Sequence, residues 1–274
     1  MMEFALSVDS INKHAKAMRR HILTMAVEGG TSHVGSALSC TDILAVLYFQ
    51  VMNTTPENWE NSQADKFILS KGHGVKAWYA VLAQRGFLSV DELKTYAKDG
   101  SFLGEHPVYP SVKGITCATG SLGHGLPVAG GIALARKINK DAGRVFVLLS
   151  DGECNEGSVW EAAMFAAHRQ LDNLTVIVDD NQWQALGRSR EVSALEPFGD
   201  KWESFGWETA FVNGHDTDAL GRALTTGWHR SGCPKALIAR TCLGKGVSFM
   251  EDDLLWHYQI PSKDQLHQAL VQLE

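Results

Sequence analysis

The chain has 274 residues, of which 45% are hydrophobic and 20% are charged, and its formal net charge is −6. This composition is ordinary for a globular protein, and the length suits one large α/β domain. A nucleic-acid-binding protein would carry a basic face, so we expect no nucleic-acid partner.

The cysteines and the hydropathy indicate where the protein works. The chain has five cysteines, an odd number, widely spaced and without a Cys-x-x-Cys motif. This pattern argues against a disulfide framework or a zinc site and favours a reducing compartment. Residues 1–21 lack the basic-then-apolar order of a signal peptide, and no apolar run approaches the roughly 18 residues of a membrane span. We therefore expect a cytoplasmic protein without membrane association.

Helical and strand patterns alternate along the chain. Helical spacing of apolar residues or capping signals predict helices over 7–28, 39–51, 126–138, 216–229 and 262–273. They also predict a helix that contains Trp78, Val81 and Leu82 and is closed by Gly86, and a helix start at 89. Short runs rich in Val, Ile and Leu predict strands over 67–69, 145–149, 174–178, 208–212 and 235–241. The alternation indicates an α/β fold with a mostly parallel sheet flanked by helices, and we expect residues 1–274 to form a single domain.

Polar residues follow two of the strands directly. Asp151 comes after the strand at 145–149, and Asn181 follows the strand at 174–178. In an open parallel sheet, ligands bind outside the carboxyl ends of the strands, so these side chains are expected to meet at one edge. Carboxylate and amide oxygens suit Mg2+ or Ca2+, although polar residues after a strand often serve only as turn formers.

Several histidines lie beside glycines in predicted loops, and loops of this kind carry chemistry. His33, His73 and His124 lie next to or near a glycine. His106, which precedes a proline, and His257, which follows a tryptophan, belong to the same set of loop histidines. Imidazole can move protons or hydrogen-bond to a developing negative charge. The loop at 120–125 has glycines at its first, fourth and sixth positions, so it does not fit the Gly-x-Gly-x-x-Gly pattern of dinucleotide-binding proteins. It instead predicts either a helix N-terminus whose backbone amides face an anion or simply a tight turn that leads into a helix.

Seven motifs occur in the order found in one family of enzymes. They are Thr31-Ser32-His33-Val34-Gly35, Leu69-Ser70-Lys71-Gly72-His73, Glu105-His106-Pro107, Gly120–Gly125, Ser150–Gly157, Asp179-Asp180-Asn181 and Gly244-Lys245-Gly246. On these motifs the chain resembles the N-terminal, pyrophosphate-binding domain of transketolases, from about residue 10 to about residue 258. The resemblance implies a single thiamine diphosphate-binding domain.

The resemblance also implies a cofactor site. Mg2+, with Ca2+ or Mn2+ as substitutes, would be held by the Asp151 carboxylate, the Asn181 amide and the Trp183 carbonyl. The residues implied in cofactor binding are His73, Gly120, Ser121, Leu122, Gly152, Glu153 and Asn181. Thiamine diphosphate would supply the hard chemistry, and the protein would supply orientation, charge neutralisation and proton transfer.

Four residues resemble the catalytic groups of the family. His33, His106 and His257 correspond to histidines that bind substrate hydroxyls and move protons. Glu156 corresponds to a carboxylate at the subunit interface, hydrogen-bonded to the glutamate of the partner that activates the cofactor. The family usually has other residues at Ser150, Val34 and His124, and these departures affect fine contacts and not the class.

The largest departure is length, because transketolase polypeptides have about three domains and this sequence matches the first. The domain that carries the activating glutamate is not in the sequence. We therefore expect an N-terminal subunit that is active only with a separate C-terminal transketolase subunit, in a heterotetramer with two copies of each chain. The pair would transfer a two-carbon ketol unit from a ketose, such as a sugar phosphate, to an aldose.

Other functions stay open at this point. A second kind of two-chain thiamine diphosphate enzyme, such as an acyloin carboligase or a 2-oxoacid dehydrogenase, shares the Asp-Gly and Asn signals. The placed histidines favour sugar hydroxyl chemistry over that alternative. A non-catalytic regulatory subunit is disfavoured because the expected metal and histidine residues are present, and a nucleotide-binding dehydrogenase because its glycine pattern is missing.

Overall fold

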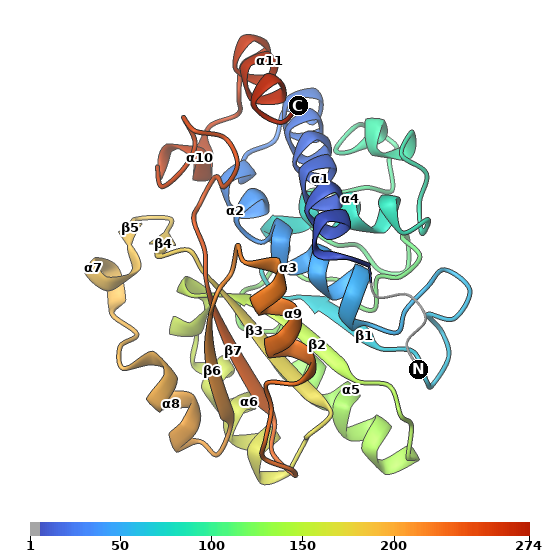
Figure 1. Ribbon diagram of the computed structural model, residues 1–274, viewed down its shortest axis with the longest axis vertical. Coiled ribbons are helices and arrows are strands. Elements are labelled where there is room, and N and C mark those ends of the chain that lie inside the picture. Colours follow the sequence, from blue (N-terminus) through green and yellow to red (C-terminus); the bar gives the residue numbers. More distant parts are fainter. Residues whose placement is uncertain (1–5) are drawn as a thin grey trace.

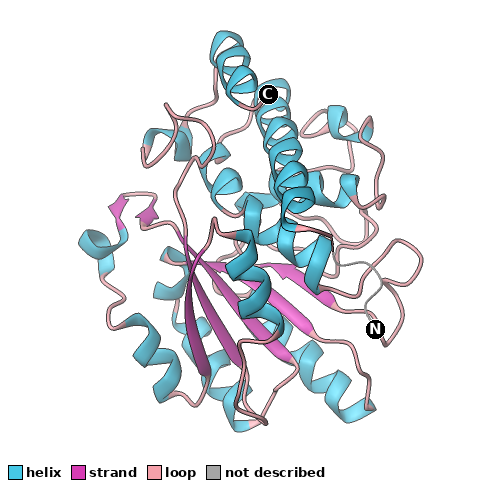
Figure 2. Cartoon of the chain, viewed as in Figure 1, coloured by secondary structure: helices cyan, strands magenta, loops and turns pink. Residues whose placement is uncertain are grey.

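A five-stranded parallel sheet lies at the centre of the molecule (Figures 1 and 2). The computed structural model describes residues 6–274; residues 1–5, part of the segment in which no signal peptide is expected, lie outside the described residues. In spatial order the strands are β1 (Lys66–Leu69), β2 (Val145–Ser150), β3 (Leu174–Asp180), β7 (Lys235–Arg240) and β6 (Glu208–Asn213). Every neighbouring pair is parallel, which confirms the expected fold class.

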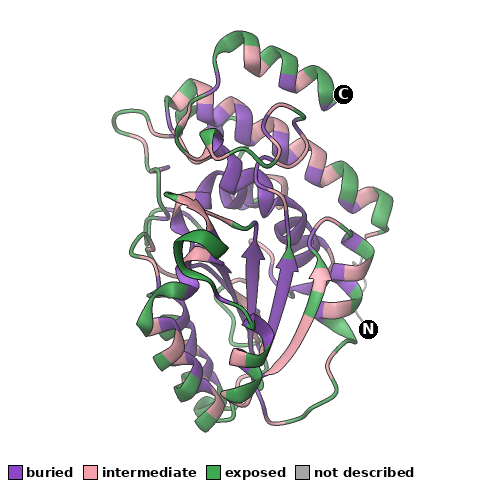
Figure 3. Ribbon diagram, turned by 90° about the vertical axis from the view of Figure 1, so that its left-hand side faces the viewer, coloured by how far each residue is buried: buried purple, intermediate pink, exposed green. Residues whose placement is uncertain are grey.

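The central strands are buried on both faces. All residues of β2 and β3 are buried, and Figure 3 shows the central strands as purple arrows. Neither face of these strands meets water, which accounts for their nearly continuous runs of Val, Ile and Leu. Strand β6 lies at the edge and is only partly buried, with the Phe211 side chain 65% exposed.

Helices cover both faces of the sheet and create two cores. One core packs Phe146 and Leu148 of β2 against α1 (Val8–Gly29), α3 (Thr41–Val46), α4 (Val75–Gln84) and α9 (Thr217–Thr225). The other packs Val147 and Leu149 against α5 (Gly125–Asn139), α6 (Gly157–His168) and α8 (Phe198–Ser204). Successive side chains of a strand point to opposite faces, so a single apolar strand contributes to both cores.

The remaining elements surround the carboxyl ends of the strands or connect the layers. They are α2 (Val34–Ser39), η1 (Leu47–Val51), η2 (Gly72–Gly74), η3 (Glu92–Thr95), η4 (Gly152–Asn155), β4 (Trp183–Gln184), β5 (Gly187–Arg188), α7 (Ser189–Ser193), α10 (Leu255–Tyr258) and α11 (Lys263–Gln272). Within residues 6–274, no helix combines the length and the apolar character needed to cross a membrane.

Two predicted helices differ from the observed ones. The segment 39–51, predicted as one helix, contains α3 and the π-helical turn η1, and α2 ends at Ser39 just before it. Between α2 and α3, the backbone of Cys40 leaves the helical conformation, with φ −90° and ψ 4°. At the end of η1, the Met52 amide donates to the carbonyl of Leu47, five residues earlier. The helix predicted over 216–229 ends at Thr225 as α9, and further along the chain the amides of His229 and Arg230 donate to the Glu208 carboxylate.

The first helix follows the prediction closely. The Ser7 hydroxyl accepts from the Ser10 amide and caps α1, and Gly30 ends the helix in the left-handed conformation that glycine tolerates. The capping signal at Ser89 and Glu92 is also present, but it starts only the short turn η3.

Candidate active site

A buried ion pair holds the strand ends together. The Lys71 ammonium, just after β1, pairs with the Asp179 carboxylate of β3, and both side chains are fully buried. The second oxygen of Asp179 accepts from the Thr241 hydroxyl after β7, and Ser39 of α2 donates to the same carboxylate at 2.6 Å. A buried charge pair is tolerated only when its remaining hydrogen bonds are made, and these contacts make them. The pair thus fixes three strand ends and α2 as one platform.

Asp151 lies at the same edge of the sheet, directly after β2, and one oxygen of its carboxylate accepts no hydrogen bond among the described residues. The side chain is buried, with an exposed fraction of 1%, and its Oδ2 accepts from the Ser189 hydroxyl at 2.6 Å. Its Oδ1 has no hydrogen-bond partner among the described residues. Burial raises the pKa of Asp151 to about 7; the Ser189 hydrogen bond opposes this, and the charge of Asp180 adds to it. A buried carboxylate oxygen without a donor is costly, so this position fits a cation ligand.

Asn181 follows the strand end that neighbours the one before Asp151, as the strand order predicts. The Asp151 amide bonds to the Asp179 carbonyl at 3.3 Å, which brings the two strand ends together. Asn181 is buried, and its Oδ1 accepts from the Trp183 amide at 3.0 Å across Gln182, whose φ is 66°. A carboxylate, an amide oxygen and a peptide carbonyl are the kinds of hard-oxygen ligand that Mg2+ prefers.

Gly152 and the hairpin formed by β4 and β5 are in close contact. A Cβ at Gly152 would lie 2.8 Å from Cγ of Gln184, so a side chain there would force the Gln184 side chain to shift. Gln184 also donates to the Asn155 side chain at 2.7 Å. Asp151 and Ser189 line a cavity of about 520 Å3 next to this hairpin, a volume in the range of small-ligand sites.

Glu153 is fully buried and its carboxylate is occupied within the chain. Its Oε1 accepts from the Gly123 amide at 2.8 Å and from the Ser70 hydroxyl, and its Oε2 accepts from the Ser150 amide at 3.2 Å. Burial raises the pKa of Glu153, and these hydrogen bonds oppose the rise. The Ser150 hydroxyl accepts in turn from the Glu153 amide, which gives this departure from the family pattern a structural role.

The loop at 120–125 lies over the end of β1. The Thr119 hydroxyl donates to the Leu69 carbonyl at 2.7 Å, and a Cβ at Gly72 would lie 3.0 Å from the Thr119 backbone. Gly120 and Ser121 are exposed, and Leu122 is partly buried. Gly123 has φ 81° and ends the turn ahead of α5, and its amide is held by the Glu153 carboxylate.

Three of the predicted histidines form one cluster. The ring centroids of His33 and His257 are 5.0 Å apart, those of His33 and His73 are 5.3 Å apart, and those of His73 and His257 are 5.9 Å apart. The His33 amide donates to the His257 carbonyl at 3.0 Å. Burial lowers the pKa of His33 to about 4 and also lowers the pKa of His73 and His257, with neighbouring positive charges adding to the effect. The three imidazoles are therefore neutral at pH 7.

His106 and Glu156 lie outside this ring cluster. His106 is exposed, and its ring lies against Gly120, where an added Cβ would be 3.5 Å from ring atom Cδ2. The pKa of His33 is lowered by burial and by several neighbouring groups that include His106, so the two histidines lie near each other. Glu156 is exposed at the N-terminus of α6 and abuts Gly123, but its side chain does not cap the helix.

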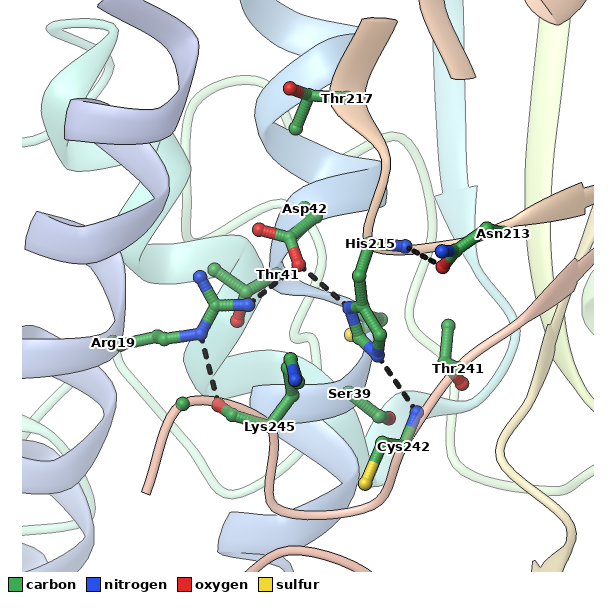
Figure 4. A network of polar contacts seen from close by, with 12 residues as sticks. Arg19, Ser39, Thr41, Asp42, Asn213, His215, Thr217, Thr241, Cys242 and Lys245 are labelled. Atoms are coloured by element: carbon green, nitrogen blue, oxygen red, sulfur yellow. Dashed lines mark hydrogen bonds and ion pairs between the residues drawn. The ribbon is translucent and has the colours of Figure 1, made fainter. Parts of the chain in front are cut away.

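A polar network that the sequence did not point to supports the loop after β7 (Figure 4). The Arg19 guanidinium donates to Asp42 Oδ2 at 2.7 Å, and the Asp42 carboxylate also lies 2.8 Å from Nδ1 of His215. The Cys242 amide donates to Nε2 of His215 at 2.8 Å, so Nδ1 carries the proton and donates to Asp42. Burial opposes ionisation, but Arg19 and His215 outweigh it and hold the pKa of Asp42 below its usual value. The position of His215, after Gly214 at the carboxyl end of β6, was the available signal.

His215→Phe should lower the free energy of unfolding by about 2–4 kcal/mol, because two buried polar groups lose a partner. His215→Gln, whose amide can still accept from the Cys242 amide, should recover part of this loss. Urea unfolding of the two variants measures the difference, with His267→Phe on the exposed face of α11 as the control. Equal stability of His215→Phe and the unchanged chain would show that the network does not support the loop.

Comparisons with known proteins agree with this geometry. The family model described as the transketolase, thiamine diphosphate binding domain matches residues 11–267. The chain is 40% identical to an apulose-4-phosphate transketolase subunit from Actinobacillus succinogenes, over 100% of this chain and 99% of that protein. It is 37% identical to a 6-deoxy-6-sulfo-D-fructose transketolase subunit of a Clostridium species, over 96% of each chain.

Solved structures give the same result for the fold. The transketolase of Campylobacter jejuni superposes with a TM-score of 0.92 and 27% identity, covering 98% of this chain and 43% of that one. The transketolase of Leishmania mexicana gives a TM-score of 0.89 and 28% identity, covering 96% of this chain and 41% of that one. The sequence thus spans about two fifths of these longer transketolases. On these matches, the chain belongs to the transketolase family of thiamine diphosphate-binding domains.

Proposed function

We propose that this chain is the diphosphate-binding subunit of a two-chain transketolase. Together with a separate C-terminal subunit, it transfers a two-carbon ketol unit from a ketose to an aldose. The observation that carries the proposal is the buried Asp151 carboxylate, whose Oδ1 lacks a donor among the described residues and lies at the same sheet edge as Asn181. The match along nearly the full length of two proteins named as transketolase subunits supports the two-chain form.

The cofactor site follows from the platform at the strand ends. Asp151, the Asn181 amide and the Trp183 carbonyl would hold Mg2+, and the Gly152 backbone would abut the diphosphate. When bound, thiamine diphosphate supplies the chemistry of carbon–carbon bond cleavage and formation. Glu153 would act indirectly, because its buried carboxylate holds the loop of Gly120, Ser121 and Leu122 in place.

The histidine cluster would bind the hydroxyl groups of the substrate and move protons. Neutral imidazoles can donate and accept hydrogen bonds to sugar hydroxyls and can take up a proton. The Ser32 hydroxyl lies 3.0 Å from Nδ1 of His33, so Nε2 is the nitrogen left for substrate. Nδ1 of His257 is buried and has no partner among residues 6–274, so it is also available for hydrogen bonding. His106, beside Gly120, would contact the substrate from the opposite loop.

An exposed apolar face supports the need for a partner. On α5 the side chains of Val128 and Ile138 are 43% and 70% exposed, and on α6 Met164 and Phe165 are 50% and 40% exposed. Helices α5 and α6 pack against each other, so these residues belong to one side of the molecule. A concentration of exposed apolar residues marks an interaction surface. We propose that the C-terminal subunit covers it, in a heterotetramer with two copies of each chain.

The substrate class is the part of the proposal that rests on the relatives. They are named for apulose-4-phosphate and for 6-deoxy-6-sulfo-D-fructose, which are ketoses that carry an anionic group. We propose a phosphorylated or sulfonated ketose as the donor.

The proposal is tested by reconstitution. The chain alone, with thiamine diphosphate and Mg2+, should show no ketol transfer, and adding the separately produced C-terminal subunit should start it. Ketose phosphates and pyruvate are compared as donors, because activity with pyruvate would indicate a carboligase or dehydrogenase instead. Robust ketol transfer by the chain alone would contradict the two-subunit proposal.

Glu156→Gln should impair assembly or activity of the two-chain enzyme much more than it weakens Mg2+ binding. Glu156 is exposed and lies against Gly123 in the loop at 120–125, but it does not belong to the group of strand ends that carries Asp151 and Asn181. Sedimentation of the mixed subunits and calorimetric titration of Mg2+ give the two readouts, with Glu161→Gln on the same helix as the control. A collapse of metal affinity with normal assembly would assign Glu156 to the metal site and not to the interface.

A further inference from the structure

Three side chains bridge two loops of the site. Trp183 and Arg188 face each other across the β4–β5 hairpin, and the Arg188 guanidinium lies 3.7 Å from the centre of the Trp183 ring. Both Arg188 terminal nitrogens donate to the Asp252 carboxylate at 2.6 Å, and the Trp183 indole N–H donates to the same carboxylate at 2.9 Å. We call Trp183, Arg188 and Asp252 the hairpin clamp.

The clamp joins a segment on each side that carries a functional residue. On the hairpin side, Trp183 follows Asn181 within one turn, and the Ser189 amide bonds back to the Gln182 carbonyl at 3.0 Å. On the other side, Asp252 lies five residues before His257, and the Asp253 carboxylate accepts from the Leu255 amide at 2.9 Å at the start of α10. A second bridge runs in parallel, because the Tyr258 hydroxyl donates to the Ala185 carbonyl.

The geometry of these contacts is suited to holding the two segments in a fixed position relative to each other. A lone exposed ion pair contributes little to stability, and the Asp252 side chain is 55% exposed. Here, however, one carboxylate receives a bidentate guanidinium and an indole N–H, and the guanidinium also stacks on that indole. Planar, bidentate contacts of this kind fix direction as well as distance. Asp252 itself has φ 59°, and its amide bonds to the Leu243 carbonyl at 2.9 Å, so its backbone is held too.

We propose that the hairpin clamp couples the metal-ligand turn to the segment carrying His257, so that Trp183, Arg188 and Asp252 are positioning residues for both the cation and the substrate histidines. The coupling continues into the cluster, because the His257 carbonyl accepts from the His33 amide. The inference rests on the proposed function for its metal readout, but the mechanical link between the two segments stands on contacts within this chain.

Hydrogen exchange in the full chain without metal tests the link itself. In Arg188→Met and Asp252→Asn, amides of both segments 182–189 and 252–258 should exchange faster by a similar factor. Arg190→Met removes an equal charge two residues away, where the side chain is 76% exposed, and should change neither segment. Faster exchange in the hairpin alone, with 252–258 unchanged, would overturn the coupling.

Terbium luminescence tests the effect on cation binding. Terbium is titrated into the full chain with thiamine diphosphate, and emission is excited through tryptophan. Arg188→Met and Asp252→Asn should each raise the half-saturating concentration about tenfold, the lower end of the effect of removing outer-shell partners of a metal site. Trp183→Phe keeps a ring for stacking but loses the indole N–H and changes the excitation. Its affinity is therefore measured by calorimetric titration of Mg2+ and should fall between those of the unchanged chain and Arg188→Met.

A double variant separates coupling from independent damage. Arg188→Met with Asp252→Asn should bind terbium no more weakly than either single variant, because both remove the same contact. Additive losses, or unchanged affinity in the single variants, would overturn the proposal. If the unchanged chain does not bind terbium at all, the proposed metal site fails, and the exchange experiment alone decides the clamp.

Discussion

Asp151→Asn should abolish Mg2+-dependent cofactor binding and lower ketol transfer by the assembled enzyme by at least about a thousandfold, within the span attributed to electrostatic groups at active sites. At the same time the metal-free chain should become more stable, by about 1–3 kcal/mol, the cost of a buried group without its partner. Asparagine keeps an oxygen for the Ser189 hydroxyl but removes a buried charge that has Asp179 and Asp180 as neighbours. Loss of binding together with gain of stability is the signature of a ligand residue.

Calorimetric titration of Mg2+ with thiamine diphosphate measures the binding, and urea unfolding in weakly alkaline, metal-free buffer measures the stability. Asp180→Asn is the matched control. Asp180 lines the same cavity, and burial raises its pKa to about 6, but its carboxylate is 3.3 Å from the Arg240 guanidinium. The Asp180→Asn variant should therefore still bind Mg2+ in the calorimetric titration. An Asp151→Asn chain that is less stable than the unchanged chain would mean that the carboxylate is a structural group.

His33→Asn should lower kcat of the assembled enzyme by about 10²–10⁴, the usual contribution of a positioned acid–base group. Asparagine is the appropriate replacement because His33 has φ 61°, a left-handed conformation that asparagine accepts more readily than most residues. The fold should therefore survive, and the affinity for Mg2+ and thiamine diphosphate should change little. A normal kcat with a raised KM would assign His33 to ground-state binding alone.

The same variant should make the chain less sensitive to acid. The folded pKa of His33 is about 4 and its usual value is 6.5, so between these values the unfolded chain binds more protons and stability falls as the pH falls. Full linkage would give about 3 kcal/mol, and solvent screening of the partly exposed ring reduces this to the order of 1–2 kcal/mol. His73 and His257 shift in the same direction, so His33→Asn should reduce the slope without removing it. Urea midpoints across this pH window provide the measurement, and an unchanged slope would refute it.

The sequence predicted the sheet and the placement of the main motifs because both depend on local pattern. Unbroken apolar runs marked the buried strands, and the rule that ligands bind at the carboxyl ends placed Asp151 beside Asn181. Glycines next to His73 and near His33 marked two of the loops whose histidine rings meet in the cluster. Which histidines would touch was beyond a local pattern, and His106 lies against Gly120 instead of joining the other three.

Contacts between distant residues could not be predicted in this way. Lys71 pairs with Asp179 across 108 positions, and nothing near either residue indicates the other. Glu153 is predicted to bind the cofactor, and no local pattern indicates that its carboxylate accepts hydrogen bonds from Ser70 and Gly123, which belong to other loops. The break at Cys40 was also hidden, because no glycine or proline stands within two residues of it and only the backbone angles change. Tertiary packing overrides helical propensity at such points.

The order of strands has a consequence for synthesis on the ribosome. Strand β7 lies between β3 and β6 although it is the last of the five to be made. Until residues 235–240 emerge, β3 is an edge strand with an apolar run and unpaired backbone groups, which is the kind of surface that pairs with other chains. Nascent chains that stop short of β7 should therefore aggregate or recruit chaperones, and release should follow completion of the sheet.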